Sequence, residues 1–242
     1  MLPFSVTLKK EMLYMLYIID SADIAKIKRC VEFFPIDGVT TNPTIISKEH
    51  TDFASLIKSI RDIIGPDKMF HIQTKADTAK GIIDEAIALN EFVGGNFYIK
   101  IPISDEGLKA TRELKKIGIK VTETAIFTQQ QALIAAKAGA DFVAPYVNRL
   151  DNIVSDGVHV VEEIVGLFKM HDMKSKVLAA SFKTVEQVHK IALAGGHAVT
   201  LNPDLYEQLV YHPLTQYAID DFNADWESVY GKHTIISLLD KK

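Results

Sequence analysis

The chain has 242 residues, of which 48% are hydrophobic and 24% charged, and its formal net charge is −4. This balance supports a large core in one or two domains and excludes an extended basic surface for nucleic acid or an anionic membrane. The single cysteine, Cys30, excludes an internal disulfide and fits a reducing cytoplasm. No apolar run reaches the ~18–20 residues of a bilayer span. We therefore expect a cytoplasmic protein that binds neither nucleic acid nor membrane.

Short apolar runs alternate with polar turns and helical stretches along the whole chain. Residues 1–12 lack the long apolar core of a signal peptide, and we expect them to be a short extension ahead of the first strand. Eight runs have the length and composition of strands. They are Leu16–Asp20, Val39–Asn42, Met69–Thr74, Phe97–Ile101, Ile119–Thr124, Phe142–Tyr146, Lys176–Ala180 and Ala198–Leu201.

The segments between these runs carry apolar residues at helical spacing, most clearly in Ala76–Phe92, Gln129–Ala138 and Val185–Ala194. Glycines Gly139 and Gly195 follow two of them, as is typical of helix ends. Eight strands alternating with helices predict an α/β fold, a (β/α)8 TIM barrel. A doubly wound sheet is the alternative, and the absence of Gly-x-Gly-x-x-Gly after the first strand argues against its dinucleotide-binding form.

No Ser/Gly-rich linker divides the chain, so we expect one domain, with a barrel over about residues 13–211 and an additional helix over about 212–230. This helix carries an apolar stripe at helical spacing, made of Leu214, Tyr217, Ala218, Phe222 and Trp226. Eight β/α units already close a barrel. The helix therefore packs either across the base of its own barrel or against a neighbouring subunit in a homo-oligomer.

A lysine stands in an unusual place, within the apolar run from Tyr98 to Pro102. Alternation along a strand puts Tyr98, Lys100 and Pro102 on one face. A buried ammonium is costly unless it is paired or loses its proton, and an unprotonated lysine is the nucleophile that a Schiff-base enzyme requires. A structural lysine, ion-paired in the barrel or reaching water from an edge strand, is the alternative.

Polar residues follow the ends of the predicted strands, where barrel enzymes of this type have their active sites. Each has a structural explanation by itself, such as a helix cap at Asp20 or a turn at Asn42–Pro43, but their shared rim favours a site. They are Asp20, Thr40, Thr41, Asn42, Gln73, Lys100, Thr124, Tyr146, Asn148, Arg149, Ser181 and Lys183.

The residues that follow the sixth and seventh predicted strands could bind an anion. Arg149, Ser181 and Lys183 follow strands six and seven, and late barrel loops often bind phosphate. We expect no metal or cofactor, because the eight histidines are scattered without ligand spacing. His71 is interpreted as a packed strand residue and His189 as a residue of a helix face.

Several motifs together resemble the transaldolase family, and more narrowly its small-subunit fructose-6-phosphate aldolase branch. The resemblance runs from about Met15 to Tyr230, with the motifs in the family's order. They are Ile19–Asp20, Gly38–Pro43, Ile99–Pro102, Ala144–Arg149 and Ala179–Thr184.

The resemblance implies a Schiff base on Lys100, with Asp20 and Asn42, beside Thr40, holding the hydroxyls of a dihydroxyacetone unit. It implies phosphate binding by Arg149, Ser181 and Lys183, sugar-phosphate substrates, and rings of five subunits paired into decamers. Gln73 and Tyr146 are the aldolase-like choices where transaldolases have Glu and Phe, and with Thr124 they suit a bound water that relays a proton. Glu123 departs from the family pattern, and we expect it on the outer face of its strand.

The main hypothesis is a metal-independent aldolase that cleaves fructose 6-phosphate to dihydroxyacetone and glyceraldehyde 3-phosphate, linked to the pentose phosphate pathway. The alternative is a transaldolase that transfers the same three-carbon unit to another sugar phosphate. A non-catalytic phosphosugar-binding protein on the same barrel is the third. Its signature would be the loss of Lys100 or Asp20, and both residues are present.

Overall fold

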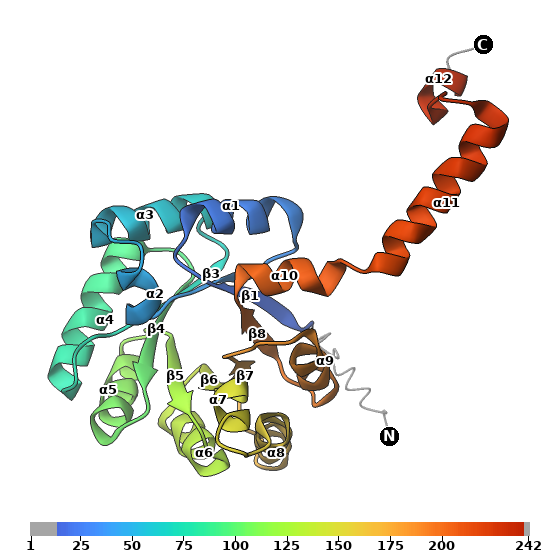
Figure 1. The fold of residues 1–242 in the computed structure, drawn as a ribbon. Helices are drawn as coiled ribbons and strands as arrows, with labels where there is room; N and C mark the ends of the chain where they lie inside the picture. Colours follow the sequence, from blue (N-terminus) through green and yellow to red (C-terminus); the bar gives the residue numbers. More distant parts are fainter. Residues whose placement is uncertain (1–13, 240–242) are drawn as a thin grey trace, which may run out of the picture. The chain divides into compact units, whose positions relative to one another are not determined.

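The computed structural model describes residues 14–239, and its centre is a closed barrel of eight parallel strands (Figure 1). The extension predicted for residues 1–12 lies outside this range. The strands are β1 (Leu16–Asp20), β2 (Gly38–Thr40), β3 (Met69–Gln73), β4 (Phe97–Pro102), β5 (Val121–Ile126), β6 (Phe142–Pro145), β7 (Lys176–Ala179) and β8 (Ala198–Leu201).

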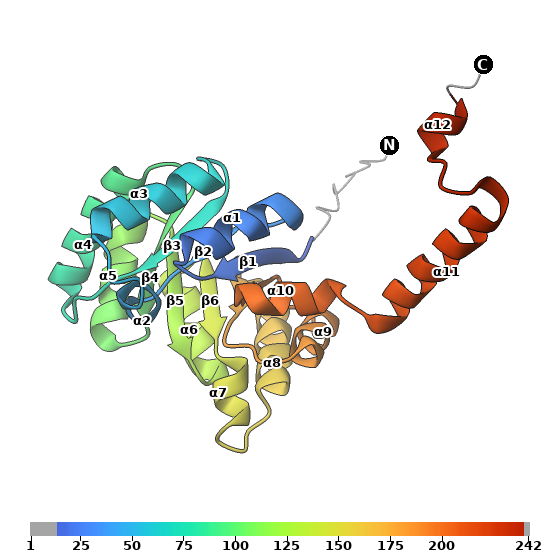
Figure 2. The ribbon, with the colours of Figure 1, turned by 45° about the horizontal axis from the view of Figure 1, so that its top comes forward.

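Helices follow the strands and form a ring around them (Figure 1). Those of the barrel are α1 (Ile24–Phe33), α2 (Pro43–Ser47), α3 (Phe53–Ile64), α4 (Ala79–Val93), α5 (Asp105–Lys116), α6 (Gln129–Ala138), α7 (Val147–Asp151), α8 (Gly157–Met170), α9 (Val185–Leu193) and α10 (Pro203–Val210). Neighbouring helices such as α4 and α5 lie side by side in both views (Figures 1 and 2).

Each strand pairs in parallel with the next along the chain, and β8 pairs back onto β1. The chain therefore has the predicted (β/α)8 TIM barrel. The doubly wound alternative is excluded because an open sheet would leave two edge strands unpaired.

Local capping explains where the helices begin and end. Helix α4 begins at Ala79, three residues later than predicted, because the Thr78 side chain accepts from the Gly81 N–H as an N-cap. Capping boxes begin α6 and α9, where Thr128 and Thr184 are the N-caps. Gly139 takes a left-handed conformation at the end of α6, as expected for a C-cap glycine.

The barrel interior is layered. An apolar cluster fills one layer, and it consists of Ile18, Met69, Phe142, Leu178 and Ala198. At Gly38 any side chain would clash, because a Cβ there would lie 2.3 Å from the carbonyl oxygen of Met69. On β1, β2, β3, β5 and β8 the later inward-facing residues are polar, as Asp20, Thr40, Gln73, Thr124 and Thr200 show, so polar groups gather towards the carboxyl ends of these strands.

Within residues 14–239 the chain divides into two compact units, with the boundary between Tyr206 and Glu207. The second contains α11 (Pro213–Tyr230), which matches the predicted C-terminal helix, and the short α12 (Ile235–Leu239). No side chain of α11 is buried, but the Trp226 ring packs against Tyr230 at a tilt of 42°, and its indole N–H donates to the carbonyl of His233 at 2.7 Å. Among the helices of residues 14–239, none is both long and apolar enough to cross a membrane.

Candidate active site at the carboxyl ends of the strands

Lys100 lies inside the barrel near the carboxyl end of β4 and is 3% exposed. Its Nζ donates to the backbone carbonyl of Thr41, just after β2, at 3.3 Å. Its positive charge also acts to lower the pKa of Asp20, which ends β1. An amine in this position is screened from bulk water but faces the polar end of the barrel.

A chain of hydrogen bonds holds the carboxylate of Asp20. Thr40 Oγ1 donates to Asp20 Oδ1 at 2.7 Å and lies 2.6 Å from Thr200 Oγ1. Because Thr40 has one hydroxyl proton and gives it to Asp20, the Thr200 hydroxyl must donate to Thr40. Burial raises the pKa of Asp20, and the charge of Lys100 and the Thr40 hydrogen bond oppose that rise.

A second group of predicted residues meets across β5 and β6. The hydroxyls of Thr124 and Tyr146 lie 3.3 Å apart. Arg149 places its guanidinium carbon 4.8 Å from the centre of the Tyr146 ring, and Phe127 packs edge-on against that ring at 5.6 Å. The phenol ring of Tyr146 is thus fixed by two neighbours, while its hydroxyl points to Thr124.

Two residues beside the site have unusual backbone conformations. Ala125 has φ of +57° at a β-bulge that shifts the register between β5 and β6, directly after Thr124. Ser181, which follows β7 and Ala180, has φ of +64°. Non-glycine residues in this region are strained by roughly 1–3 kcal/mol, and such strain gathers at functional sites.

The remaining predicted residues are only partly available. Asn42 uses its side-chain oxygen to cap α2, accepting from the Ile45 N–H at 3.0 Å, where the sequence suggested a turn as the structural alternative. Ser181 accepts a backbone hydrogen bond from Asn148 at 2.8 Å and so ties the two late loops together. The Lys183 N–H donates to Gln187, but its ammonium is on an exposed side chain.

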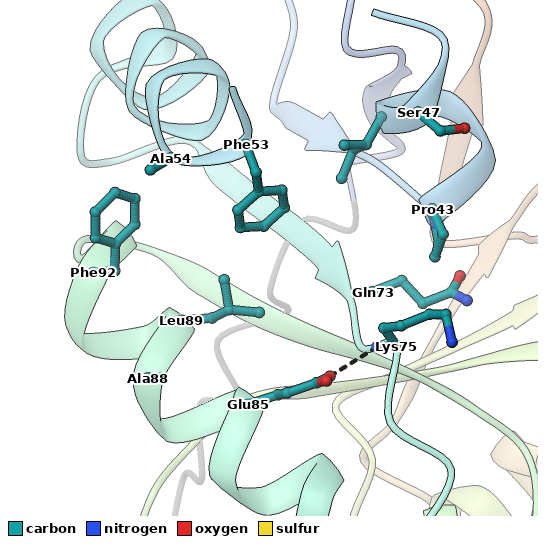
Figure 3. Close-up of a pocket in the computed structure, with 11 residues that line it drawn as sticks. Pro43, Ser47, Phe53, Ala54, Gln73, Lys75, Glu85, Ala88, Leu89 and Phe92 are labelled. Atoms are coloured by element: carbon teal, nitrogen blue, oxygen red, sulfur yellow. Dashed lines mark hydrogen bonds between the residues drawn. The ribbon is translucent and has the colours of Figure 1, made fainter. Parts of the chain in front are cut away.

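Gln73 ends β3 opposite Lys100, with which it is in register. It also borders a cavity of about 640 Å³ between α2, α3 and α4 (Figure 3). Phe53, Leu89 and Phe92 line one end of this cavity and Pro43, Gln73 and Lys75 the other (Figure 3). The carboxylate of Glu85 accepts from the Lys75 N–H at 2.7 Å (Figure 3). The cavity lies outside the barrel and touches the polar site only through Gln73.

Glu123 lies on the outer face of β5, as expected. It is fully buried against α5, where Oε1 accepts from the Thr111 hydroxyl at 2.6 Å and Oε2 has no partner. Burial raises the pKa of Glu123 to about 7, against the effect of that hydrogen bond. Its neighbours Thr122 and Thr124 point into the barrel instead.

Three features of the site are missing from the sequence prediction. The Thr200 hydroxyl is hydrogen-bonded to the Thr40 hydroxyl, and the carbonyl of Thr41 accepts a hydrogen bond from Lys100 Nζ. The His71 ring is hydrogen-bonded to Thr122 inside the barrel. Two-residue alternation from Ala198 would have placed Thr200 on the inner face. Nothing in the sequence singles out a backbone carbonyl. Within residues 14–239, no group of three or more His, Cys, Asp or Glu side chains could hold a metal ion.

Polar groups at the carboxyl ends of a closed parallel barrel define the chain as a barrel enzyme. The transaldolase/fructose-6-phosphate aldolase family model matches residues 17–235, and the chain belongs to this family. A Streptococcus pneumoniae protein named "Probable fructose-6-phosphate aldolase" is 38% identical over 220 residues, which cover 90% of this chain and 99% of that protein.

Solved structures support the fold alone. The structure of native KDPGal has a TM-score of 0.57 and 16% identity, covering 84% of this chain and 86% of its own. A flavocytochrome b2 mutant with bound pyruvate has a TM-score of 0.59 and 13% identity, covering 80% of this chain and 58% of its own. At these identities the likeness concerns the arrangement of strands and helices, and the chemistry of the site must be argued from its residues.

Proposed function

We propose that this protein is a Schiff-base aldolase that reversibly cleaves fructose 6-phosphate to dihydroxyacetone and glyceraldehyde 3-phosphate. The observation that carries the proposal is the position of Lys100. It is buried inside the barrel, its amine is held by a backbone carbonyl, and Asp20 is the nearby acid. Family membership and the name of the Streptococcus relative support the same activity.

The reaction begins with the lysine. Unprotonated Lys100 Nζ attacks the C2 carbonyl of the ketose, and the carbinolamine loses water to give a protonated imine. The imine withdraws electrons from the C3–C4 bond. A base removes the C4 hydroxyl proton, that bond breaks with its electrons moving into the imine, and glyceraldehyde 3-phosphate leaves.

The remaining enamine is protonated at C3, and water hydrolyses the imine to release dihydroxyacetone and free Lys100. We assign the proton transfers to a water held by Gln73, Thr124 and Tyr146, with assistance from Asp20. The support for this assignment is that Gln73 lies beside Lys100 across β3 and β4, while the Thr124 and Tyr146 hydroxyls face each other.

The substrate's phosphate is assigned to Arg149, Ser181 and Lys183, and its hydroxyls to Asn42, Thr40 and Asp20. Arg149 and Lys183 are exposed at the rim and supply positive charge. The loops after β6 and β7 are joined by a backbone hydrogen bond from Asn148 to Ser181. Asn42 would meet the substrate with its amide nitrogen, because its oxygen caps α2.

Transaldolase activity is the second candidate, because the family includes both reactions. The two differ in whether the enamine is protonated and hydrolysed or waits for a second aldose phosphate. Tyr146, whose hydroxyl faces Thr124, favours the lyase because it gives the enamine a proton donor. We further propose that the protein works in the cytoplasm as a homo-oligomer, a pentamer or decamer, and serves sugar-phosphate metabolism linked to the pentose phosphate pathway.

The test combines trapping with product analysis. Dihydroxyacetone and borohydride should attach a three-carbon adduct to the peptide containing Lys100, and Lys100→Met should abolish both the adduct and turnover while leaving the fold intact. Labelling at another lysine would contradict the assignment. Fructose 6-phosphate alone should yield free dihydroxyacetone. A product that forms only when erythrose 4-phosphate is added would instead identify a transaldolase.

A further inference from the structure

A polar cluster lies inside the barrel on three neighbouring strands, β3, β4 and β5, with His71 and Thr122 buried and Tyr98 partly buried. His71 is fully buried, and its ring stacks on that of Tyr98 at 4.5 Å with an angle of 7° between the planes. Its Nδ1 lies 2.9 Å from Thr122 Oγ1. Phe142 packs edge-on against both rings. We call His71, Tyr98 and Thr122 the polar platform.

The strand register places the polar platform next to the proposed site. Side chains two residues apart on a strand point to the same face. Gln73 follows His71 by two residues, Lys100 follows Tyr98, and Thr124 follows Thr122. His71 is in register with Tyr98, and Lys100 is in register with both Gln73 and Thr122. His71 and Tyr98 therefore lie one inward-facing position before Gln73 and Lys100, while Thr122 is paired with Lys100 and lies one inward-facing position before Thr124.

The backbone of His71 is linked to Lys100 as well. Its carbonyl accepts from the Thr41 N–H at 2.9 Å and from the Thr41 hydroxyl at 3.3 Å. The carbonyl of Thr41 in turn accepts from Lys100 Nζ at 3.3 Å. A shift of His71 would thus move both the side-chain layer below Lys100 and the group that holds its amine.

The imidazole is not explained by packing alone. Burial, with a smaller effect of the charge of Lys100, lowers the pKa of His71 to about 3, so the ring is neutral. Its Nε2 is buried without a hydrogen-bond partner. An unpartnered buried polar atom opposes folding, and a phenylalanine would stack on Tyr98 without it. The polar ring is retained at a cost to stability next to the reactive lysine.

We propose that His71, through its bond to Thr122 and its stack on Tyr98, is a positioning residue that aligns Lys100, Gln73 and Thr124 for imine formation and proton transfer. This inference rests on the proposed function. It assigns no proton transfer to His71, whose ring hydrogen-bonds Thr122 and packs against Tyr98 and Phe142. A misplacement of about 1 Å among such residues can lower a rate roughly a hundred-fold.

The test substitutes His71→Phe, which keeps the ring stack and removes the bond to Thr122. We expect kcat for fructose 6-phosphate cleavage and the rate of borohydride trapping with dihydroxyacetone to fall about ten- to a hundred-fold. KM should change little, and the unfolding midpoint should be unchanged or higher, since the unpartnered nitrogen is gone. The matched control is Ile72→Val, on the outer face of β3, which should lower the unfolding midpoint and leave kcat unchanged.

Thr122 provides a second, independent test. Thr122→Val should reduce kcat as His71→Phe does, Thr122→Ser should restore most of it, and the double variant His71→Phe/Thr122→Val should lose little more than either alone. If the single variants fold and retain the wild-type kcat and trapping rate, the inference is wrong. If wild-type protein forms no adduct on Lys100, the proposed function fails, and this inference fails with it.

Discussion

The hydroxyl of Tyr146 is the part of its side chain that is available for chemistry. Arg149 and Phe127 already contact the ring, and the hydroxyl faces Thr124 at 3.3 Å. Tyr146→Phe would therefore keep the ring contacts and remove one proton donor. We expect release of free dihydroxyacetone to fall about ten- to a thousand-fold, the range for one acid–base or hydrogen-bonding group.

Transfer of the three-carbon unit to an added aldehyde should fall much less, because the acceptor intercepts the enamine without that donor. The comparison requires both products to be quantified in one preparation by chromatography. Thr124→Ser is the matched variant, since it retains the hydroxyl that Tyr146 faces, and it should keep the wild-type product ratio. Equal losses of release and transfer in Tyr146→Phe would make the residue a general contributor to the reaction.

Arg149 lies at the same rim, where its guanidinium carbon is 4.8 Å from the centre of the Tyr146 ring and its side chain is exposed to solvent. Arg149→Ala should raise KM for fructose 6-phosphate roughly ten- to a hundred-fold, the value of a charged hydrogen bond, and leave the trapping of dihydroxyacetone nearly unchanged. Steady-state kinetics with both ligands measures this difference. Arg112→Ala, at an exposed site on α5, is the control, and a matched loss with both ligands in Arg149→Ala would assign the residue to the chemistry.

At the scale of the elements, the junction of β5 and α5 contains a carboxyl group with a large effect on stability. Burial raises the folded-state pKa of Glu123 from 4.5 to about 7. Between these values the unfolded chain releases the proton while the folded protein keeps it, so stability falls as pH rises from about 4.5 to 7. A shift of this size corresponds to roughly 3 kcal/mol.

Glu123→Gln should remove this dependence. The variant should be more stable than the wild type above pH 7, and the difference should shrink towards pH 4.5, as chemical denaturation across that range would measure. Glu91→Gln, at an exposed site on α4, is the control and should leave the pH dependence unaltered. Parallel stability curves for Glu123→Gln and wild type would show that Glu123 ionises normally in the folded protein.

The elements were more predictable than the contacts between them. The short apolar runs predicted β1 and β8, and the helical spacing that ends at a glycine predicted α6, all with their observed bounds. These signals are local to the chain. The predicted fifth strand was two residues early at both ends, and at its carboxyl end the bulge at Ala125 extends β5 to Ile126. The polar residues at the rim of the barrel could be located from the predicted ends of the strands alone. The bonds from Thr200 to Thr40 and from His71 to Thr122 join strands distant in sequence, and one sequence does not specify such pairs.

At the scale of the whole molecule, the second unit contains a helix that does not belong to the eight β/α repeats. In α11 the side chains of Leu214, Tyr217 and Phe222 are 64–69% exposed, which is unusual for three large apolar groups on one helix. The predicted stripe also included Trp226, but this residue is engaged by Tyr230 and His233 within its own unit. The apolar surface available for a subunit contact is therefore centred on Leu214, Tyr217 and Phe222.

We expect this surface to hold the homo-oligomer together. Phe222→Asp places a charge on it and should release smaller species in light scattering at micromolar concentration, with far-ultraviolet circular dichroism unchanged. Asn223→Asp adds the same charge at the next, polar position and should leave the oligomer intact. Chains that end at Tyr211 should behave as Phe222→Asp does while the barrel strands stay folded. A wild-type protein that is monomeric at micromolar concentration would disprove the subunit contact without affecting the role of Lys100, since every residue proposed for the chemistry lies in the first unit.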